Sequence, residues 1–164
     1  MPDPGAERIV ASYGRLFEDF RVGDVYEHRP GRTVTAADNI HFSLLTMNRH
    51  PLHCDEAWAS GSEFGRTLVN STLTLAIVTG LSVDDVSARA IANLGWREVK
   101  LIAPVFAGDT LYARTKVLGT RESKTRPDAG IVTALTEGYK QDGTVVIRFE
   151  RQILVPRRSH GSAP

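Results

Sequence analysis

The densest cluster of reactive side chains in this sequence lies in the run Thr46-Met-Asn-Arg-His-Pro-Leu-His-Cys-Asp55. Of these residue types, imidazole is the one that readily accepts and releases a proton near neutral pH. His53 is a candidate for proton transfer on this ground, although a histidine at a junction between a loop and a helix is more often a structural residue. Pro51 stiffens the loop that would hold His53 in place. An amide cannot accept a proton at neutral pH, so Asn48 can only position water or substrate by hydrogen bonds.

A second candidate feature is the pair Asn70-Ser71, which predicts the start of a helix over residues 72–79 that ends near Gly80. This stretch is apolar nearly all round, so we expect the helix to be buried on most sides. Backbone N–H groups at the start of a helix favour a nearby negative charge. Amides around Ser71, with Asn70 beside them, are therefore candidate donors to an oxyanion or to another substrate oxygen.

The elements that must position these residues begin with a predicted strand over residues 25–34. A capping box between Thr35 and Asp38 then predicts the start of a helix. That helix carries Ile40, Leu44 and Leu45 on one face. After a loop, Asp55 is expected to cap a second, short helix.

The second half of the chain predicts four long strands joined by short turns rich in Gly, Asp and Pro. They cover residues 96–105, 110–118, 131–139 and 145–155. Short connections between long strands indicate an antiparallel sheet. One buried helix and one long, curved sheet predict an α+β fold in which the sheet wraps around the helix, with a short helical segment overhanging it. The open edges of such a sheet favour a homodimer.

Composition limits the class of protein. Hydrophobic residues make up 41% and charged residues 24% of the chain, as in ordinary globular domains. We expect one domain over residues 16–156, a flexible segment over residues 1–15 and a disordered tail over residues 157–164. The net charge of +1 gives no reason to expect nucleic acid as a partner. The most apolar stretch is too short to span a membrane, so we expect no membrane partner either.

The single cysteine, Cys54, rules out an internal disulfide and favours the reducing cytoplasm. We interpret its side chain as a small buried hydrophobe. Together with His50, His53 and Asp55 it could be drawn as a metal site. Such tight clustering does not supply tetrahedral ligands from separate directions, so we expect no metal and no cofactor.

The run from Thr46 to Asp55 resembles the signature of the MaoC-like, (R)-specific enoyl-CoA hydratases, in which Gly-Asp-x-Asn-Pro-Leu-His precedes an acidic residue. The resemblance continues to Asn70-Ser71, where the family usually has His-Gly, and covers about residues 20–156. It is closest to the branch that acts on mesaconyl-CoA, itaconyl-CoA or methylmalyl-CoA. That branch shares Thr-Met-Asn-x-x-Pro-Leu-His and Arg-Glu-Ser-Lys-x-Arg-Pro-Asp-x-Gly-Ile-Val, found here at residues 121–132.

This resemblance implies a hot-dog fold and an acyl-CoA thioester as substrate. The implied reaction is the reversible hydration of a short, branched or dicarboxylic enoyl-CoA of the itaconyl-CoA or mesaconyl-CoA type. It assigns catalysis to His53. The family's catalytic Asp lies five residues before its His, where this chain has Asn48. Because the closer branch shares this Asn, we interpret Asn48 as part of a variant mechanism.

Basic residues are candidates for further substrate contacts. Arg49 and His50 could bind a free carboxylate on the acyl group, since the planar fork of an arginine fits that shape. Arg121, Lys124 and Arg126 lie at a predicted hairpin turn. They are either a solvated tip or contacts to the phosphates of coenzyme A, and the sequence does not choose between these alternatives.

Two other functions stay open. A hot-dog acyl-CoA thioesterase would need a carboxylate to drive water onto the thioester carbonyl, and Asn48 argues against it. A non-catalytic acyl-CoA-binding protein is compatible with the same Asn48.

Overall fold

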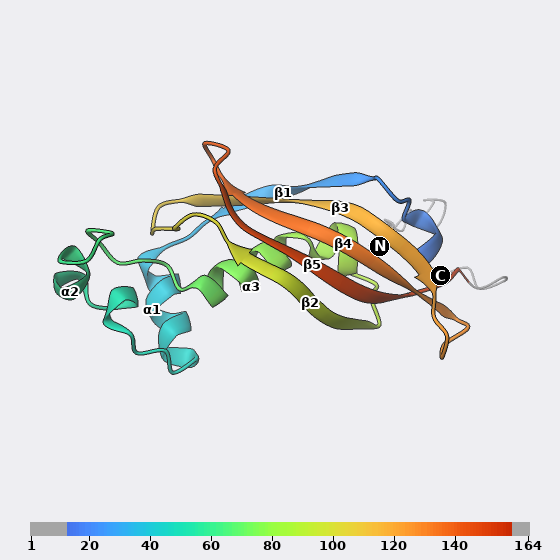
Figure 1. The fold of residues 1–164 in the computed structure, drawn as a ribbon, viewed down its shortest axis with the longest axis horizontal. Coiled ribbons are helices and arrows are strands. Elements are labelled where there is room, and N and C mark those ends of the chain that lie inside the picture. Colours follow the sequence, from blue (N-terminus) through green and yellow to red (C-terminus); the bar gives the residue numbers. More distant parts are fainter. Residues whose placement is uncertain (1–12, 159–164) are drawn as a thin grey trace, which may run out of the picture.

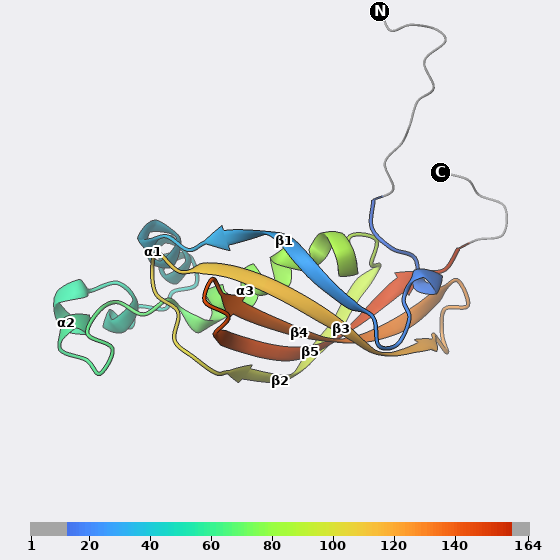
Figure 2. The same ribbon diagram turned by 90° about the horizontal axis from the view of Figure 1, so that it is seen from above.

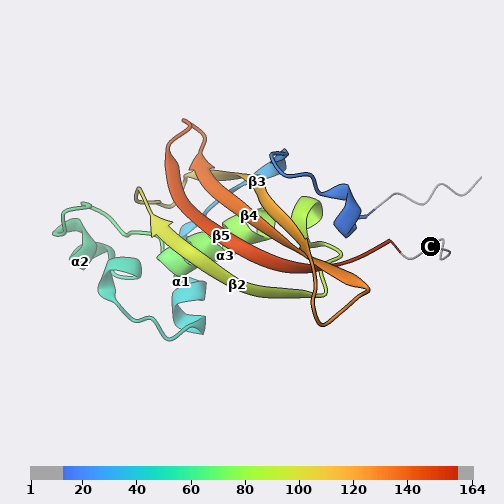
Figure 3. The same ribbon diagram turned by 45° about the vertical axis from the view of Figure 1, so that its right-hand side comes forward.

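A computed structural model of the chain describes residues 13–158 and confirms the predicted α+β architecture. Its single sheet has the strand order β1-β3-β4-β5-β2, with all neighbours antiparallel. The strands are β1 (Val25–Thr33), β2 (Ala92–Leu101), β3 (Thr110–Glu122), β4 (Ala129–Lys140) and β5 (Val145–Pro156). They curve around one face of the central helix α3 (Ser71–Leu81) (Figures 1 and 3).

The core lies between helix α3 and the concave face of the sheet. The helix buries Leu73, Thr74, Ile77 and Val78. The sheet contributes fully buried side chains to the same core, among them Leu111, Ile147 and Phe149. Gly138 of β4 lies directly beneath the helix, where a Cβ atom would overlap the side chain of Val78. The missing side chain therefore lets the helix approach the sheet closely.

The prediction that helix α3 is buried on most sides is wrong for one of its faces. The residues of that face are small and exposed: Ser71, Thr72, Ala76 and Gly80. A sheet of five strands covers only part of the circumference of a helix, and the bulky side chains occupy the covered part. The described residues therefore leave the outer side of α3 open.

Helix α1 (Ala36–Leu45) begins at the predicted capping box. The Asp38 N–H donates to Thr35 Oγ1 at 3.1 Å, and the Thr35 N–H donates to the Asp38 carboxylate at 2.9 Å. The apolar residues of the predicted face are exposed, however: Ile40, Leu44 and Leu45. Phe42 of the same helix packs against the core. The buried face of α1 carries the polar residues Asn39 and Ser43. The apolar face that periodicity revealed is therefore not packed against the described part of this chain.

Strand β2 also differs from its prediction, since it begins at Ala92 and ends at Leu101. It forms one edge of the sheet, and its pairing with β5 is interrupted by two irregularities. Exposed apolar side chains lie along this strand and just after it: Leu94, Trp96, Val99, Leu101 and Ile102. This edge is thus unusually apolar for a surface in contact with water.

The segment between α1 and α3 overhangs the end of the sheet, as predicted (Figure 2). It contains the 3-10 turn Pro51–His53 and helix α2 (Glu56–Ser60), which begins where the Trp58 N–H donates to the Asp55 side chain at 3.0 Å. The hairpin between β3 and β4 lies at the opposite end of the molecule (Figure 1). No helix within residues 13–158 is long and apolar enough to cross a membrane.

The two terminal segments, expected to be flexible over residues 1–15 and disordered over residues 157–164, lie mostly outside the described residues. In their described parts, Arg15 forms an ion pair with Asp85 at 3.0 Å. Arg157 forms one with Glu122 at 2.8 Å.

A buried histidine of β1 contacts the π-helical segment Val83–Ser87, which follows α3. His28 has no exposed surface, and its Nδ1 and Nε2 atoms each lie 2.8 Å from an oxygen, of Asp85 and Thr115 respectively. Burial lowers the pKa of His28, although the bond and charge of Asp85 oppose that shift. The ring is therefore neutral, with Nδ1 donating to Asp85 and Nε2 accepting from Thr115. Because both nitrogens are occupied and buried, His28 is a structural residue.

Candidate active site

The half-buried His53 side chain is fixed in one tautomer by the backbone. Its Nδ1 atom lies 2.8 Å from the carbonyl oxygen of Leu68. A carbonyl only accepts hydrogen bonds, so Nδ1 carries the hydrogen of the neutral ring and Nε2 carries the lone pair. Within residues 13–158, Nε2 makes no hydrogen bond. Nε2 is therefore the atom that can accept a proton from a bound water molecule.

Asn48 follows α1 through a left-handed turn. Met47 has a φ of 58°, and the N–H groups of Met47 and Asn48 donate to the carbonyls of Leu44 (3.1 Å) and Ser43 (2.9 Å). This pair of bonds ends the helix as a Schellman motif, in which glycine is the usual left-handed residue. The Asn48 Oδ1 atom accepts from the His50 N–H at 3.2 Å. Its Nδ2 group has no such partner within the described residues, so Asn48 can donate to a water molecule or a substrate.

The start of helix α3 leaves one backbone amide free. The Asn70 N–H donates to Asn39 Oδ1 at 2.8 Å, and the Thr72 N–H donates to Asn70 Oδ1 at 3.0 Å. Between them, the Ser71 N–H donates to no group within residues 13–158. Because the helix dipole favours negative charge at this point, the Ser71 amide can stabilise an oxyanion.

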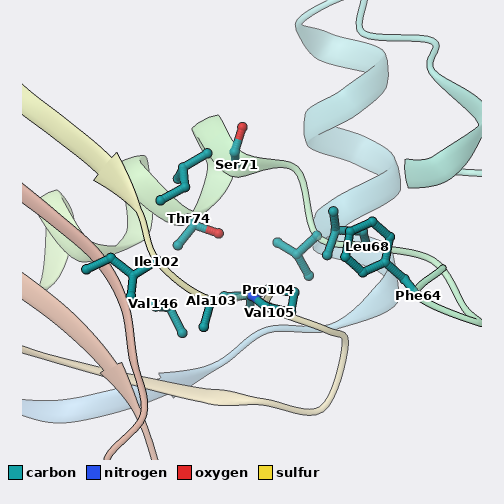
Figure 4. A pocket seen from close by; sticks show the side chains of 11 residues that line it. Phe64, Leu68, Ser71, Thr74, Ile102, Ala103, Pro104, Val105 and Val146 are labelled. Carbon is teal, nitrogen blue, oxygen red and sulfur yellow. The ribbon is translucent and has the colours of Figure 1, made fainter.

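A cavity of about 230 Å³ opens beside this helix start (Figure 4). Leu68 and Ser71 are among its lining residues, so it adjoins both the segment that orients His53 and the free amide. The remaining lining residues are Phe64, Val69, Thr74, Leu101, Ile102, Ala103, Pro104, Val105 and Val146. None of them is charged. The cavity therefore suits a small, apolar group.

Of the predicted site residues, Ser71 lines this cavity, whereas His53, Asn48 and Asn70 are not among its lining residues. Arg49 and His50 are exposed, and the His50 ring packs edge-on against Trp58 with 5.6 Å between centroids. Arg121, Lys124 and Arg126 belong to the β3–β4 hairpin at the far end of the molecule (Figure 1). A single chain therefore does not bring these three cations together with His53.

The interpretation of Cys54 as a buried hydrophobe is wrong. Cys54 is exposed, because the 3-10 turn directs it away from the core, and its Sγ atom lies 3.7 Å from the His50 carbonyl oxygen. Within residues 13–158 no three His, Cys, Asp or Glu side chains lie close enough together to hold a metal ion.

Sequence reasoning missed the buried polar residues of helix α1. Asn39 is 4% exposed, and its side chain binds both the His53 segment and the start of α3. A signal was present in the sequence: Asn39 and Ser43 are four residues apart, which places them on one face of a helix. The apolar residues Ile40, Leu44 and Leu45 lie on the other side of the helix, so the pattern predicts that the face of Asn39 and Ser43 is the exposed one.

The chain belongs to the MaoC-like family, because the sequence profile described as "MaoC like domain" matches residues 19–139. The chain is 34% identical over 145 residues to a mesaconyl-CoA hydratase of Cereibacter sphaeroides, a match that covers 88% of this chain and 42% of that protein. It is 35% identical over 145 residues to a β-methylmalyl-CoA dehydratase of Chloroflexus aurantiacus, covering 88% and 41%. The resemblance to this branch of hydratases is thereby confirmed.

A solved structure supports the fold assignment. The chain superimposes with a TM-score of 0.80 on a double-hotdog protein of Mycobacterium tuberculosis at 25% identity, covering 92% of this chain and 46% of that one. The predicted hot-dog fold is confirmed. The chain spans about two fifths of the length of the two curated relatives named above, and about half of the double-hotdog chain.

Proposed function

We propose that this chain is a hydro-lyase unit that adds water reversibly to the double bond of a short, branched enoyl-CoA. The observation that carries the proposal is the unoccupied Nε2 of His53, whose ring is fixed by the carbonyl of Leu68. Leu68 lines an apolar cavity together with Ser71, the residue with the free helix-terminal amide. The names of the relatives, mesaconyl-CoA hydratase and β-methylmalyl-CoA dehydratase, support the same reaction class.

In the hydration direction, His53 Nε2 accepts a proton from water while the water oxygen forms a bond to Cβ of the enoyl group. The electrons of the double bond move toward the thioester, whose oxygen becomes an enolate. The Ser71 N–H and the dipole of α3 stabilise that negative charge. The imidazolium then returns its proton to Cα, so one water molecule has been added and His53 is neutral again. Asn48 donates from Nδ2 to the attacking water and thereby orients it.

The cavity supports a short acyl group. Its volume of about 230 Å³ and uncharged lining fit a short, branched chain. A free carboxylate, as in itaconyl-CoA or mesaconyl-CoA, would have to lie outside this lining. Arg49 is an exposed cation on the loop that carries His53, and we propose that it meets such a carboxylate together with His50.

The function is tested by giving the purified chain crotonyl-CoA, mesaconyl-CoA and itaconyl-CoA. We expect the enoyl absorbance to fall while no free thiol is released. Release of thiol would overturn the proposal in favour of a thioesterase. Tight binding of all three compounds without any change in absorbance would overturn it in favour of an acyl-CoA-binding protein.

We further propose that the unit acts as a homodimer built on the β2 edge. Both β2 and α1 carry exposed apolar residues suited to burial, such as Trp96 and Leu45. Leu101 and Ile102 line the cavity yet are 60% and 52% exposed. A second copy on this edge would therefore close the open side of the cavity. The cytoplasm is the location we propose, because an exposed thiol such as Cys54 stays reduced there.

A two-fold dimer would also give the β3–β4 hairpin, which is distant from His53 in its own chain, a place near the site of the partner. Pairing β2 with its copy in an antiparallel ladder reverses one unit relative to the other. The β3–β4 hairpin of one unit would then lie toward the overhang of its partner. We propose that Arg121, Lys124 and Arg126 act there on the phosphates of coenzyme A bound to the partner. Arg126 forms an ion pair with Asp128 at 2.8 Å, so it is already oriented by its own turn.

We expect light scattering at micromolar concentration to give twice the chain mass of 18.0 kDa. Replacement of Trp96 by Glu should shift the protein to the monomer, because a charge would have to be buried at the contact. Val25→Glu is the matched control, since it introduces the same charge at an exposed apolar residue on the opposite edge strand. A wild-type monomer, or dissociation by Val25→Glu alone, would contradict the β2 interface.

A further inference from the structure

One buried side chain connects the three segments that form the candidate active site. The Asn39 Nδ2 group donates to the carbonyl oxygens of His53 at 2.9 Å and Leu68 at 3.1 Å. Its Oδ1 atom accepts from the Asn70 N–H at 2.8 Å. Asn39 is 4% exposed and belongs to α1. It therefore joins the base-bearing loop, the segment that orients the base and the start of α3.

The chemistry of these contacts requires a carboxamide. Two donated bonds and one accepted bond must come from the same short, planar group. A carboxylate of equal size could accept from the Asn70 N–H, but its second oxygen would face two carbonyl oxygens. A hydroxyl has a single donor, and an aliphatic side chain has none. Asn39 thus matches all three backbone groups at once, which few other residues could do.

The Leu68 carbonyl is the point at which Asn39 and His53 meet. This oxygen accepts from Asn39 Nδ2 and also from His53 Nδ1. Asn39 therefore holds the acceptor that selects the ring tautomer, and it holds the backbone of His53 as well. By occupying the Asn70 N–H, it leaves the Ser71 amide as the free donor at the helix start.

We propose that Asn39 is a positioning residue that fixes the His53 tautomer and holds His53 in register with the Ser71 amide. This inference rests on the proposed hydratase function. Proton transfer and oxyanion stabilisation act on the same substrate, so the base and the amide must keep a fixed separation. A misplacement of about 1 Å can cost about 10²-fold in rate. Asn39 contacts the backbone of the lining residue Leu68 but does not itself line the cavity, so its loss should affect kcat much more than KM.

The test compares Asn39→Ala and Asn39→Asp with the control Ser43→Ala. Ser43 is 1% exposed one turn further along α1, and its hydroxyl accepts from Asn70 Nδ2 at 3.4 Å. Within residues 13–158 it makes no hydrogen bond to His53. We expect kcat of both Asn39 variants to fall about 10²-fold, with KM within about threefold of wild type. Nitrogen NMR should show hydrogen on Nδ1 of neutral His53 in the wild type and in Ser43→Ala, and a mixture of tautomers in the Asn39 variants.

A merely structural role predicts a different result. The melting temperature would fall, but kcat below that temperature and the His53 tautomer would match the wild type, and this outcome would overturn the proposal. If neither Asn39 variant folds, a measurement on the wild-type protein tests the proposal instead. The NMR signals of the Asn39 side-chain amide should shift when His53 gains or loses a proton. Signals that stay constant during this change would also overturn the proposal. A wild-type protein that hydrates no enoyl-CoA would refute the proposed function. The tautomer measurement would still test whether Asn39 fixes the His53 ring.

Discussion

Replacing His53 by Ala is expected to lower kcat/KM for the best enoyl-CoA by at least about 10²-fold, the usual scale for general acid–base catalysis. The physical reason is that the neutral rings of His28 and His50 each have their lone pair occupied by a hydrogen bond. His28 is buried with both ring nitrogens bonded. The ring of His50 lies 6.0 Å from that of His53 and caps the 3-10 turn through Nδ1. Steady-state kinetics with crotonyl-CoA and mesaconyl-CoA provide the measurement.

The fold should survive this substitution. The ring of His53 makes one hydrogen bond, to the Leu68 carbonyl, and that carbonyl keeps its bond from Asn39. The loss should therefore cost only about 1 kcal/mol of folding free energy. His41→Ala is the matched control, because it removes an exposed imidazole from α1. An active His53→Ala enzyme would remove His53 from the mechanism, and equal losses in both variants would indicate an effect unrelated to proton transfer.

The sequence predicted the sheet and the helix starts well because their signals are local. The capping box at Thr35 and the cap at Asp55 depend on residues three positions apart, and both formed as expected. Strand β2 begins four residues before the predicted residue 96. The pattern missed this start because Ala92 to Gly95 lacks a clear alternation of apolar and polar residues. The exposed face of α1 shows another limit: periodicity predicts that Ile40 and Leu44 share a face, but not what covers that face.

The candidate site was only partly predictable for a related reason. His53 and Asn48 lie in one short run whose residue types already indicate proton transfer and hydrogen bonding. The importance of Asn39 depends on backbone groups at residues 53, 68 and 70, which only the folded chain brings together. Likewise, the free amide of Ser71 can be identified only after the bonds of its two neighbours are known.

Replacing Asn48 by Ala is expected to lower kcat about 10²-fold, the effect of removing one well-placed donor, and to leave acyl-CoA binding nearly intact. The oxygen of the Asn48 side chain accepts from the His50 N–H, which leaves Nδ2 as the group that can donate to a water molecule or a substrate. An alanine at this position would leave the attacking water without an orienting donor. A variant with unchanged kcat would show that the water is oriented by another group.

Asn48→Asp gives the sharper result, because it keeps an oxygen for the His50 N–H and replaces the Nδ2 donor by a negative charge. If the natural substrate carries its own carboxylate, that charge should repel it. We therefore expect the ratio of kcat/KM for crotonyl-CoA to that for itaconyl-CoA to rise above its wild-type value. Gln141→Glu, which adds the same charge at an exposed turn between β4 and β5, should leave the ratio unchanged. A ratio in Asn48→Asp that stays constant or falls would mean that Asn48 is not there to tolerate a substrate carboxylate. The uncharged lining of the cavity would then point to a purely aliphatic acyl group.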